Sequence, residues 1–141
     1  MAYEPRIKDL AIRGQDSEAL IDELPGTQSR DQIQLVANAA GYPPNCILAK
    51  FTSGANAGKW GRWDAAQTAT DGSQIARGFL YQRRRASTTQ TTRATAITRS
   101  AELDGKKVNY GTTDADKIAT CNAQLLSMDT TNRIGGIRVR Y

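Results

Sequence analysis

A single stretch of the chain carries the apolar spacing of a convincing amphipathic helix, and it lies near the C-terminus. Thr113 can cap this helix, while Asp114 and Asp116 lie in its first turn, where negative charge is favourable. Because there is only one such helix, most of the core has to come from other elements. Asn122 is the exception on the apolar side, whose other members are Ala115, Ile118, Ala119, Cys121, Leu125, Leu126 and Met128.

From about Asp31 onward the pattern changes to the two-residue period of half-buried β-strands, with Ile33 and Leu35 alternating with glutamines. Gly78 interrupts an apolar segment, which predicts a bulge or a close approach of another backbone. The dipeptide at residues 71–72, Asp-Gly, is a strong turn signal. The sequence therefore predicts a mainly β fold with a minor α component. Further strands are expected at residues 46–52, 75–82, 92–98 and 137–140, and a short extended segment at 107–110.

Residues 1–29 are interpreted as an extended N-terminal arm, because their apolar residues are sparse and scattered. Residues 18–23 could begin a short helix, but isolated helices of that length are marginal. At 141 residues the chain is long enough to bury one core. We therefore expect an arm over residues 1–29 and a single domain over residues 30–141. The apolar residues of the arm are Leu10, Ile12, Leu20, Ile21 and Leu24, followed by a turn at Pro25.

Charge is distributed unevenly along the chain. Residues 1–35 hold four basic and seven acidic residues, a net charge of −3, whereas residues 36–141 hold 15 basic and seven acidic residues, a net charge of +8. An acidic N-terminal segment followed by a basic remainder indicates two surfaces with different partners. No apolar stretch is long enough to cross a membrane, and the N-terminus lacks the apolar run of a signal peptide.

The chain contains no histidine, which limits the catalytic and metal sites that it can form. It excludes Ser-His-Asp and Cys-His catalysis and zinc sites that use imidazole. Cys46 and Cys121 are too few for an all-cysteine zinc site, and we expect two buried thiols. Among the seven carboxylates of residues 36–141, Asp64 and Glu102 remain as a theoretical acid–base pair after turns and helix capping are accounted for. We therefore expect no enzymatic activity, no cofactor and no metal.

Two groups of side chains are open to more than one interpretation. Trp60 and Trp63 point to opposite faces if they lie on a strand, so one can be in the core and the other at an interface, or both can be in the core. Arg83, Arg84 and Arg85 are either a solvated strand end or an anion-binding patch. With Arg93 and Arg99 they would form a basic nucleic-acid-binding module, but the acidic arm argues against this.

The order of short motifs along the chain resembles the lambda-type bacteriophage head decoration protein family, over about residues 29–140. The resemblance implies a small, mostly β protein, and we expect a β-barrel or β-clip-like domain. The motifs are residues 29–33 (SRDQI), 40–41 (AG), 46–52 (CILAKFT), 58–60 (GKW), 63–64 (WD), 71–80 (DGSQIARGFL), 102–103 (EL) and 136–140 (GIRVR).

The same resemblance implies a capsid decoration, or cement, protein of the virion. Such a protein binds the outside of the expanded head as trimers at threefold sites and stabilises the shell against packaged DNA. The expected partners are the major capsid protein and two further copies of the chain, with synthesis and assembly in the host cytoplasm and no direct role in binding nucleic acid. Another phage structural β protein, from the tail or connector, is an alternative. Candidate capsid-binding residues are Leu10, Ile12, Leu20, Ile21, Leu24 and Pro25; candidate interface residues are Trp60, Trp63, Arg83, Arg84 and Arg85.

Overall fold

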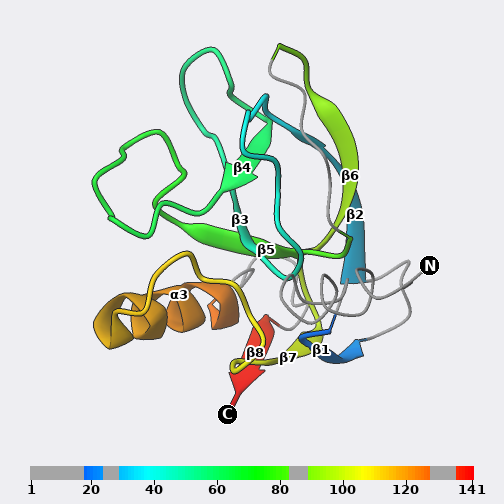
Figure 1. Cartoon of the computed structure of the whole chain (residues 1–141), viewed down its shortest axis with the longest axis vertical. Coiled ribbons are helices and arrows are strands. Elements are labelled where there is room, and N and C mark those ends of the chain that lie inside the picture. The colour runs from blue at the N-terminus through cyan, green and yellow to red at the C-terminus, as the bar shows by residue number, and fades with distance from the viewer. Residues whose placement is uncertain (1–17, 24–28, 83–88, 128–135) are drawn as a thin grey trace, which may run out of the picture.

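The computed structural model describes residues 18–23, 29–82, 89–127 and 136–141. In these residues a closed barrel lies above a small sheet, and one helix packs beside that sheet (Figure 1). The mainly β fold with one C-terminal helix is confirmed. The elements are β1 (Leu20–Glu23), β2 (Arg30–Leu35), β3 (Ile47–Lys50), β4 (Trp60–Arg62), β5 (Ala76–Leu80), β6 (Thr92–Ile97), β7 (Ala101–Asp104), α3 (Ala115–Leu126) and β8 (Ile137–Arg140).

The barrel has the strand order β2-β4-β3-β5-β6 and closes on itself. Its longest ladder is the antiparallel pair β2–β6, which runs from Arg30 opposite Ile97 to Leu35 opposite Thr92. The other neighbours are also antiparallel, except that β2 meets β4 in parallel where Leu35 lies opposite Trp60. Closure leaves no free edge in the barrel, which removes one route to unwanted strand pairing.

The second sheet has the order β1-β7-β8, with β1 antiparallel and β8 parallel to β7. Helix α3 packs against both β5 of the barrel and β8 of this sheet. The helix therefore bridges the two sheets (Figure 1).

The buried residues divide into two cores. The barrel core consists of side chains that point inward, and the outer core lies between the barrel wall, α3 and the second sheet. Strands alternate between the two: Leu48 belongs to the barrel core, while its neighbours Ile47 and Ala49 belong to the outer core. This explains why β3 is buried on both faces. The barrel core is Ile33, Leu35, Tyr42, Cys46, Leu48, Leu80, Ala94 and Ala96; the outer core includes Ile47, Ala49, Trp63, Phe79, Ile97, Leu103, Cys121, Leu125 and Ile137.

Gly78 has both features that its place in the sequence predicts. The pairing of β3 with β5 shifts register between Leu48 and Ala49, which marks a bulge beside Gly78. A Cβ atom on Gly78 would lie 3.0 Å from the carbonyl oxygen of Ile97, so the neighbouring backbone leaves little room for a side chain.

The helix begins one residue later than the sequence predicts. Its N-cap is Asp114, not Thr113, because the Asp114 carboxylate accepts hydrogen bonds from the amides of Asp116 (3.0 Å) and Lys117 (3.4 Å). The polar exception Asn122 also has a structural role. Its side-chain amide accepts a hydrogen bond from the Tyr110 hydroxyl (2.9 Å) and donates one to the Tyr141 hydroxyl (2.8 Å).

One local suggestion is wrong. Residues 20–23 form strand β1 rather than a helix, because they pair with β7. Within the short extended segment predicted at residues 107–110, Asn109 makes an isolated bridge with Cys46. The closing strand is confirmed, with Ile137 buried and Arg138 and Arg140 exposed.

Candidate functional site

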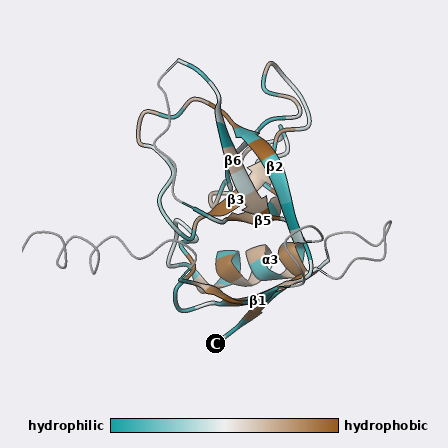
Figure 2. Ribbon diagram, turned by 90° about the vertical axis from the view of Figure 1, so that its right-hand side faces the viewer, coloured by the Kyte–Doolittle hydropathy of each residue, from teal (hydrophilic) through white to brown (hydrophobic). Residues whose placement is uncertain are grey.

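Exposed apolar side chains gather at the end of the molecule that carries the second sheet. Among the described residues, the large hydrophobic side chains that remain exposed are Ile21 (55%), Leu126 (56%) and Tyr141 (69%). They lie on β1, at the end of α3 and just after β8. The loops at the opposite end of the barrel mix hydrophilic and apolar residues (Figure 2) and carry none of these three side chains. The sheet end is therefore the candidate interaction surface.

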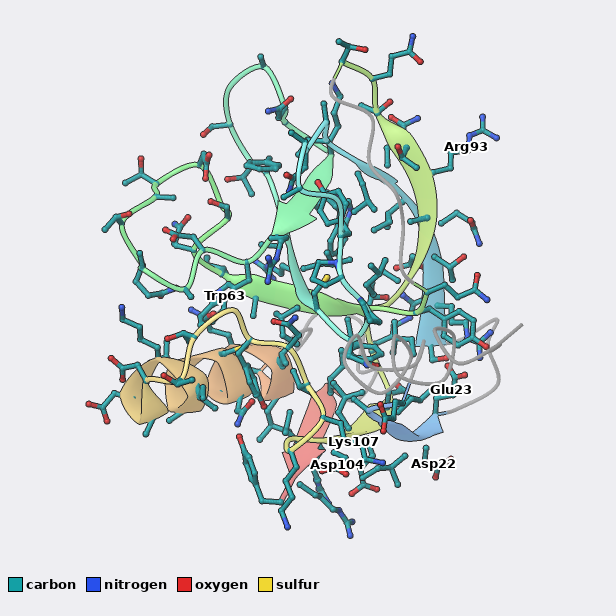
Figure 3. The ribbon with its side chains drawn as sticks, viewed as in Figure 1. Asp22, Glu23, Trp63, Arg93, Asp104 and Lys107 are labelled. Atoms are coloured by element: carbon teal, nitrogen blue, oxygen red, sulfur yellow. The ribbon has the colours of Figure 1, made fainter. Side chains whose placement is uncertain are left out.

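Charge on this sheet changes from acidic at β1 to basic at β8. Asp22 on β1 lies opposite Glu102 on β7, and Glu102 lies opposite Arg138 on β8. Two residues further along, Asp104 lies opposite Arg140, whose guanidinium contacts the carboxylate of Glu102. The acidic residues Asp22, Glu23 and Asp104 all lie at this end (Figure 3). The two edges of the sheet thus carry opposite charges.

An open depression of about 500 Å³ lies at the same end. It spans the sheet from Asp22 and Glu23 on one side to Arg138 on the other, and Leu126 of α3 contributes an apolar patch. The depression combines apolar surface with both signs of charge, which suits contact with another protein.

A cluster of polar contacts ties β1 to the barrel. The Arg30 Nε donates to both carboxylate oxygens of Glu23, at 3.0 and 3.1 Å, and Ser29 also donates to this carboxylate. The Arg30 guanidinium lies 3.9 Å above the Tyr81 ring. The hydrogen bonds from Arg30 are the main cause that holds the pKa of Glu23 below its ordinary value. The end of β1 is therefore fixed against the start of β2.

The predicted arm residues have different environments. Leu20 is partly buried and packs against the outer core, whereas Ile21 is exposed. Leu20 is thus already used inside the fold. The other candidates, Leu10, Ile12, Leu24 and Pro25, lie outside the described residues.

The two tryptophans contact different cores. Trp63 is 5% exposed in the outer core, and its indole N–H donates to the carbonyl of Gln74 (3.0 Å). Trp60 is partly buried against the barrel core. Neither is a prominent surface residue. The candidate interface residues Arg83, Arg84 and Arg85 lie outside the described residues.

The remaining basic residues of the nucleic-acid alternative are not brought together. Arg93 is exposed near the start of β6 (Figure 3), whereas Arg99 follows its other end. Six residues of extended chain separate them by roughly 20 Å. Arg99 is also engaged with the carboxylate of Asp31 (2.7 Å) and the hydroxyl of Thr98 (2.8 Å). The structure gives these arginines no common surface.

The candidate acidic pair is likewise separated in the fold. Asp64 lies in a barrel loop, where its carboxylate accepts amide hydrogen bonds from Ala66, Thr68 and Ala69 at 2.9–3.0 Å. The bond from Ala69 is the main cause that lowers its pKa. Glu102 lies on β7 and contacts Arg140. Asp64 thus organises a loop.

Cys46 and Cys121 are buried thiols, as the sequence predicts, and burial raises the pKa of each to about 12. In the part of the chain that the structure describes, no three His, Cys, Asp or Glu side chains are grouped so as to hold a metal ion. None of the described helices is long and apolar enough to cross a membrane.

Sequence reasoning found the alternation of β8 but missed that Asp22 and Arg138 lie on either side of Glu102 in one sheet. No sequence pattern could reveal this arrangement, because strands that are distant in sequence and adjacent in a sheet leave no local pattern.

Comparison with known proteins gives one match. A family model described as bacteriophage lambda head decoration protein D matches residues 11–129, which is most of the chain. No curated protein and no solved structure matches it.

Proposed function

This chain belongs to the bacteriophage lambda head decoration protein D family, and on that premise we propose how it decorates the head. It binds the outer surface of the expanded phage head as trimers at threefold sites and stabilises the shell against the pressure of packaged DNA. Its partners are the major capsid protein and two further copies of itself. It is made and assembled in the host cytoplasm, acts by binding and has no catalytic role.

The observation that carries the proposal is the clustering of exposed apolar side chains at the sheet end. Ile21, Leu126 and Tyr141 would leave water on contact with the shell, which is favourable by roughly 25 cal/mol per Å² of apolar surface. Among the described residues, the loops at the other end of the barrel carry no exposed large hydrophobic side chain, which suits a surface that stays in contact with water. The sheet end therefore faces the capsid.

Residues 1–29 take part in attachment as an arm on the domain of residues 30–141. Glu18, just before β1, pairs with Lys107 at the sheet end, and the proposed arm contacts extend the same surface. Fixing a backbone costs about 1–2 kcal/mol per residue, so the arm has to bury extensive surface or pair with a capsid strand. Three arms in a trimer make attachment multivalent, and individually weak contacts then suffice. The proposed anchors are Leu10, Ile12, Ile21, Leu24 and Pro25, with Leu20 holding β1 to the body.

Co-sedimentation with expanded, undecorated capsids tests this proposal. The full chain should bind saturably, and a variant lacking residues 1–17, which keeps β1, should show clearly lower occupancy at the same concentration. Arg93→Ala on the barrel surface is the matched control and should bind like the full chain. Undiminished occupancy of the truncated variant would refute the role of the arm.

Naked DNA in a parallel sample separates decoration from the basic-module alternative. Binding only to DNA, and loss of that binding as salt increases, would refute decoration.

A further inference from the structure

Asp22 and Arg138 lie at the same level along the strand direction, on opposite edges of the second sheet. Both are placed opposite Glu102 of the central strand, one from β1 and the other from β8. In the described part of the chain, β1 and β8 are the two edge strands of this sheet. Both side chains belong to exposed residues.

Three carboxylates at this end are paired within the chain, whereas Asp22 and Arg138, like Asp104 on the central strand, are in no ion pair among the described residues. Glu23 pairs with Arg30, Glu102 with Arg140, and Glu18 with Lys107 at 3.5 Å. Among the described residues, the Asp22 carboxylate accepts only the amide of the next residue, and no carboxylate pairs with Arg138. One edge thus presents a carboxylate without a cation, and the other a guanidinium without an anion.

We propose that the β1 edge of one copy packs against the β8 edge of the next, with Asp22 of the first copy paired with Arg138 of the second. This inference rests on the proposed function, because it states how the copies of the decorating trimer associate. The contact is head-to-tail: each copy uses its acidic edge on one side and its basic edge on the other. Such contacts close into a ring when the rotation returns to its start.

The equal height of the two residues is what a closed ring requires. A ring is generated by rotation without translation along the axis, so groups that meet must lie at the same level. Around an axis parallel to these strands, Asp22 and Arg138 satisfy that condition. Their opposite charges also disfavour the alternative in which like edges meet.

The contact is made by side chains rather than by a continuous sheet. Strand β1 shifts register between Leu20 and Asp22, which leaves Ile21 at a bulge, and both edge strands are short and charged. Those features disfavour addition of another strand.

Disulfide trapping tests the arrangement, using Asp22→Cys and Arg138→Cys. Two strand spacings of about 4.8 Å place these positions roughly 10 Å apart within one chain. That exceeds the Cα separation of about 7 Å beyond which a disulfide cannot form without backbone movement, so any bond is between copies. Under mild oxidation, on capsids and in concentrated solution, the double variant should give covalent dimers and trimers on a non-reducing gel.

The single variants make the test specific for head-to-tail contact. Asp22→Cys alone and Arg138→Cys alone should each stay monomeric, whereas their mixture should give dimers and nothing larger. Asp22→Cys combined with Arg93→Cys, on the barrel, is the control and should not cross-link. The native thiols Cys46 and Cys121 are buried and should not contribute.

The outcomes separate this inference from the proposed function. Capsids that are fully occupied by the double variant but give no cross-linked species would overturn the edge contact and leave decoration standing. Cross-linking of a single variant with itself would overturn the head-to-tail arrangement. Cross-linked rings in solution without any capsid binding would support the edge contact and refute decoration.

Discussion

Leu125 and Leu126 are adjacent on helix α3, yet the structure gives them opposite roles. Leu125 is fully buried in the outer core, and Leu126 is 56% exposed at the sheet end. The same substitution at the two positions, Leu125→Ala and Leu126→Ala, therefore separates stability from binding. The two variants are matched controls for each other, because both replace leucine by alanine in the last turn of the same helix.

The expected magnitudes differ severalfold. Leu125→Ala removes three buried carbon groups at about 0.8 kcal/mol each, and the cavity left behind adds to the loss, giving a decrease of about 3–4 kcal/mol in the free energy of unfolding. Leu126 buries less than half of its surface, so its substitution should lower that free energy by about 1 kcal/mol or less. The favourable helix propensity of alanine reduces the second figure further.

Urea unfolding, with the slope m compared between variants, measures both free energies. Capsid occupancy is then compared under conditions in which each variant is folded. Leu126→Ala should reduce occupancy, and Leu125→Ala should leave it close to that of the parent chain. Equal losses of stability would refute the assignment of the two faces, and unchanged occupancy for Leu126→Ala would remove α3 from the capsid-binding surface.

Two further predictions concern the turn before β5 and the attachment of β1. Gly72→Ala should lower the free energy of unfolding by about 2 kcal/mol or more. The reason is that Gly72 has φ of +101° and that a Cβ atom there would lie 2.5 Å from the carbonyl oxygen of Lys50. Thermal unfolding measures the effect, and an unchanged Tm would contradict it. Because the pKa of Glu23 is lower in the folded than in the unfolded chain, its contribution to stability is present above the unfolded value near 4.5 and is lost as the pH falls through the folded value. Glu23→Gln should therefore be less stable than the parent at pH 7 and should lose less stability between pH 5 and pH 3, as followed by urea unfolding; parallel pH profiles would contradict the link to Arg30.

The strands that sequence predicts best are those whose two faces differ. In β2, Ile33 and Leu35 are buried and the glutamine between them is exposed, so local alternation carries the information. Strand β1 has no such pattern: in Leu20–Glu23 the middle two residues are exposed, and the segment is extended because it pairs with β7, about 80 positions later. The start of α3 differs by one residue because three successive residues, Thr112, Thr113 and Asp114, are all suitable caps.

The candidate surface was predicted less completely than the fold. The sequence identified Ile21 as an apolar residue of the arm and Arg138 as outward-facing, but it did not relate the two. Their relation depends on the order β1-β7-β8, and parallel pairing between β7 and β8 spans α3 and leaves no local signal. The exposure of Leu126 was also missed, because a helical wheel shows which side a residue occupies but not where the covering layer ends.

Strand β3 contributes side chains to both hydrophobic cores. Its residues Ile47 and Ala49 face the outer core, while Leu48 faces the barrel core. Loss of packing in one core would therefore disturb a strand that supports the other. Detaching the second sheet from the barrel would expose the outer-core face of this strand to water. We therefore expect the barrel and the second sheet to unfold together in one cooperative transition.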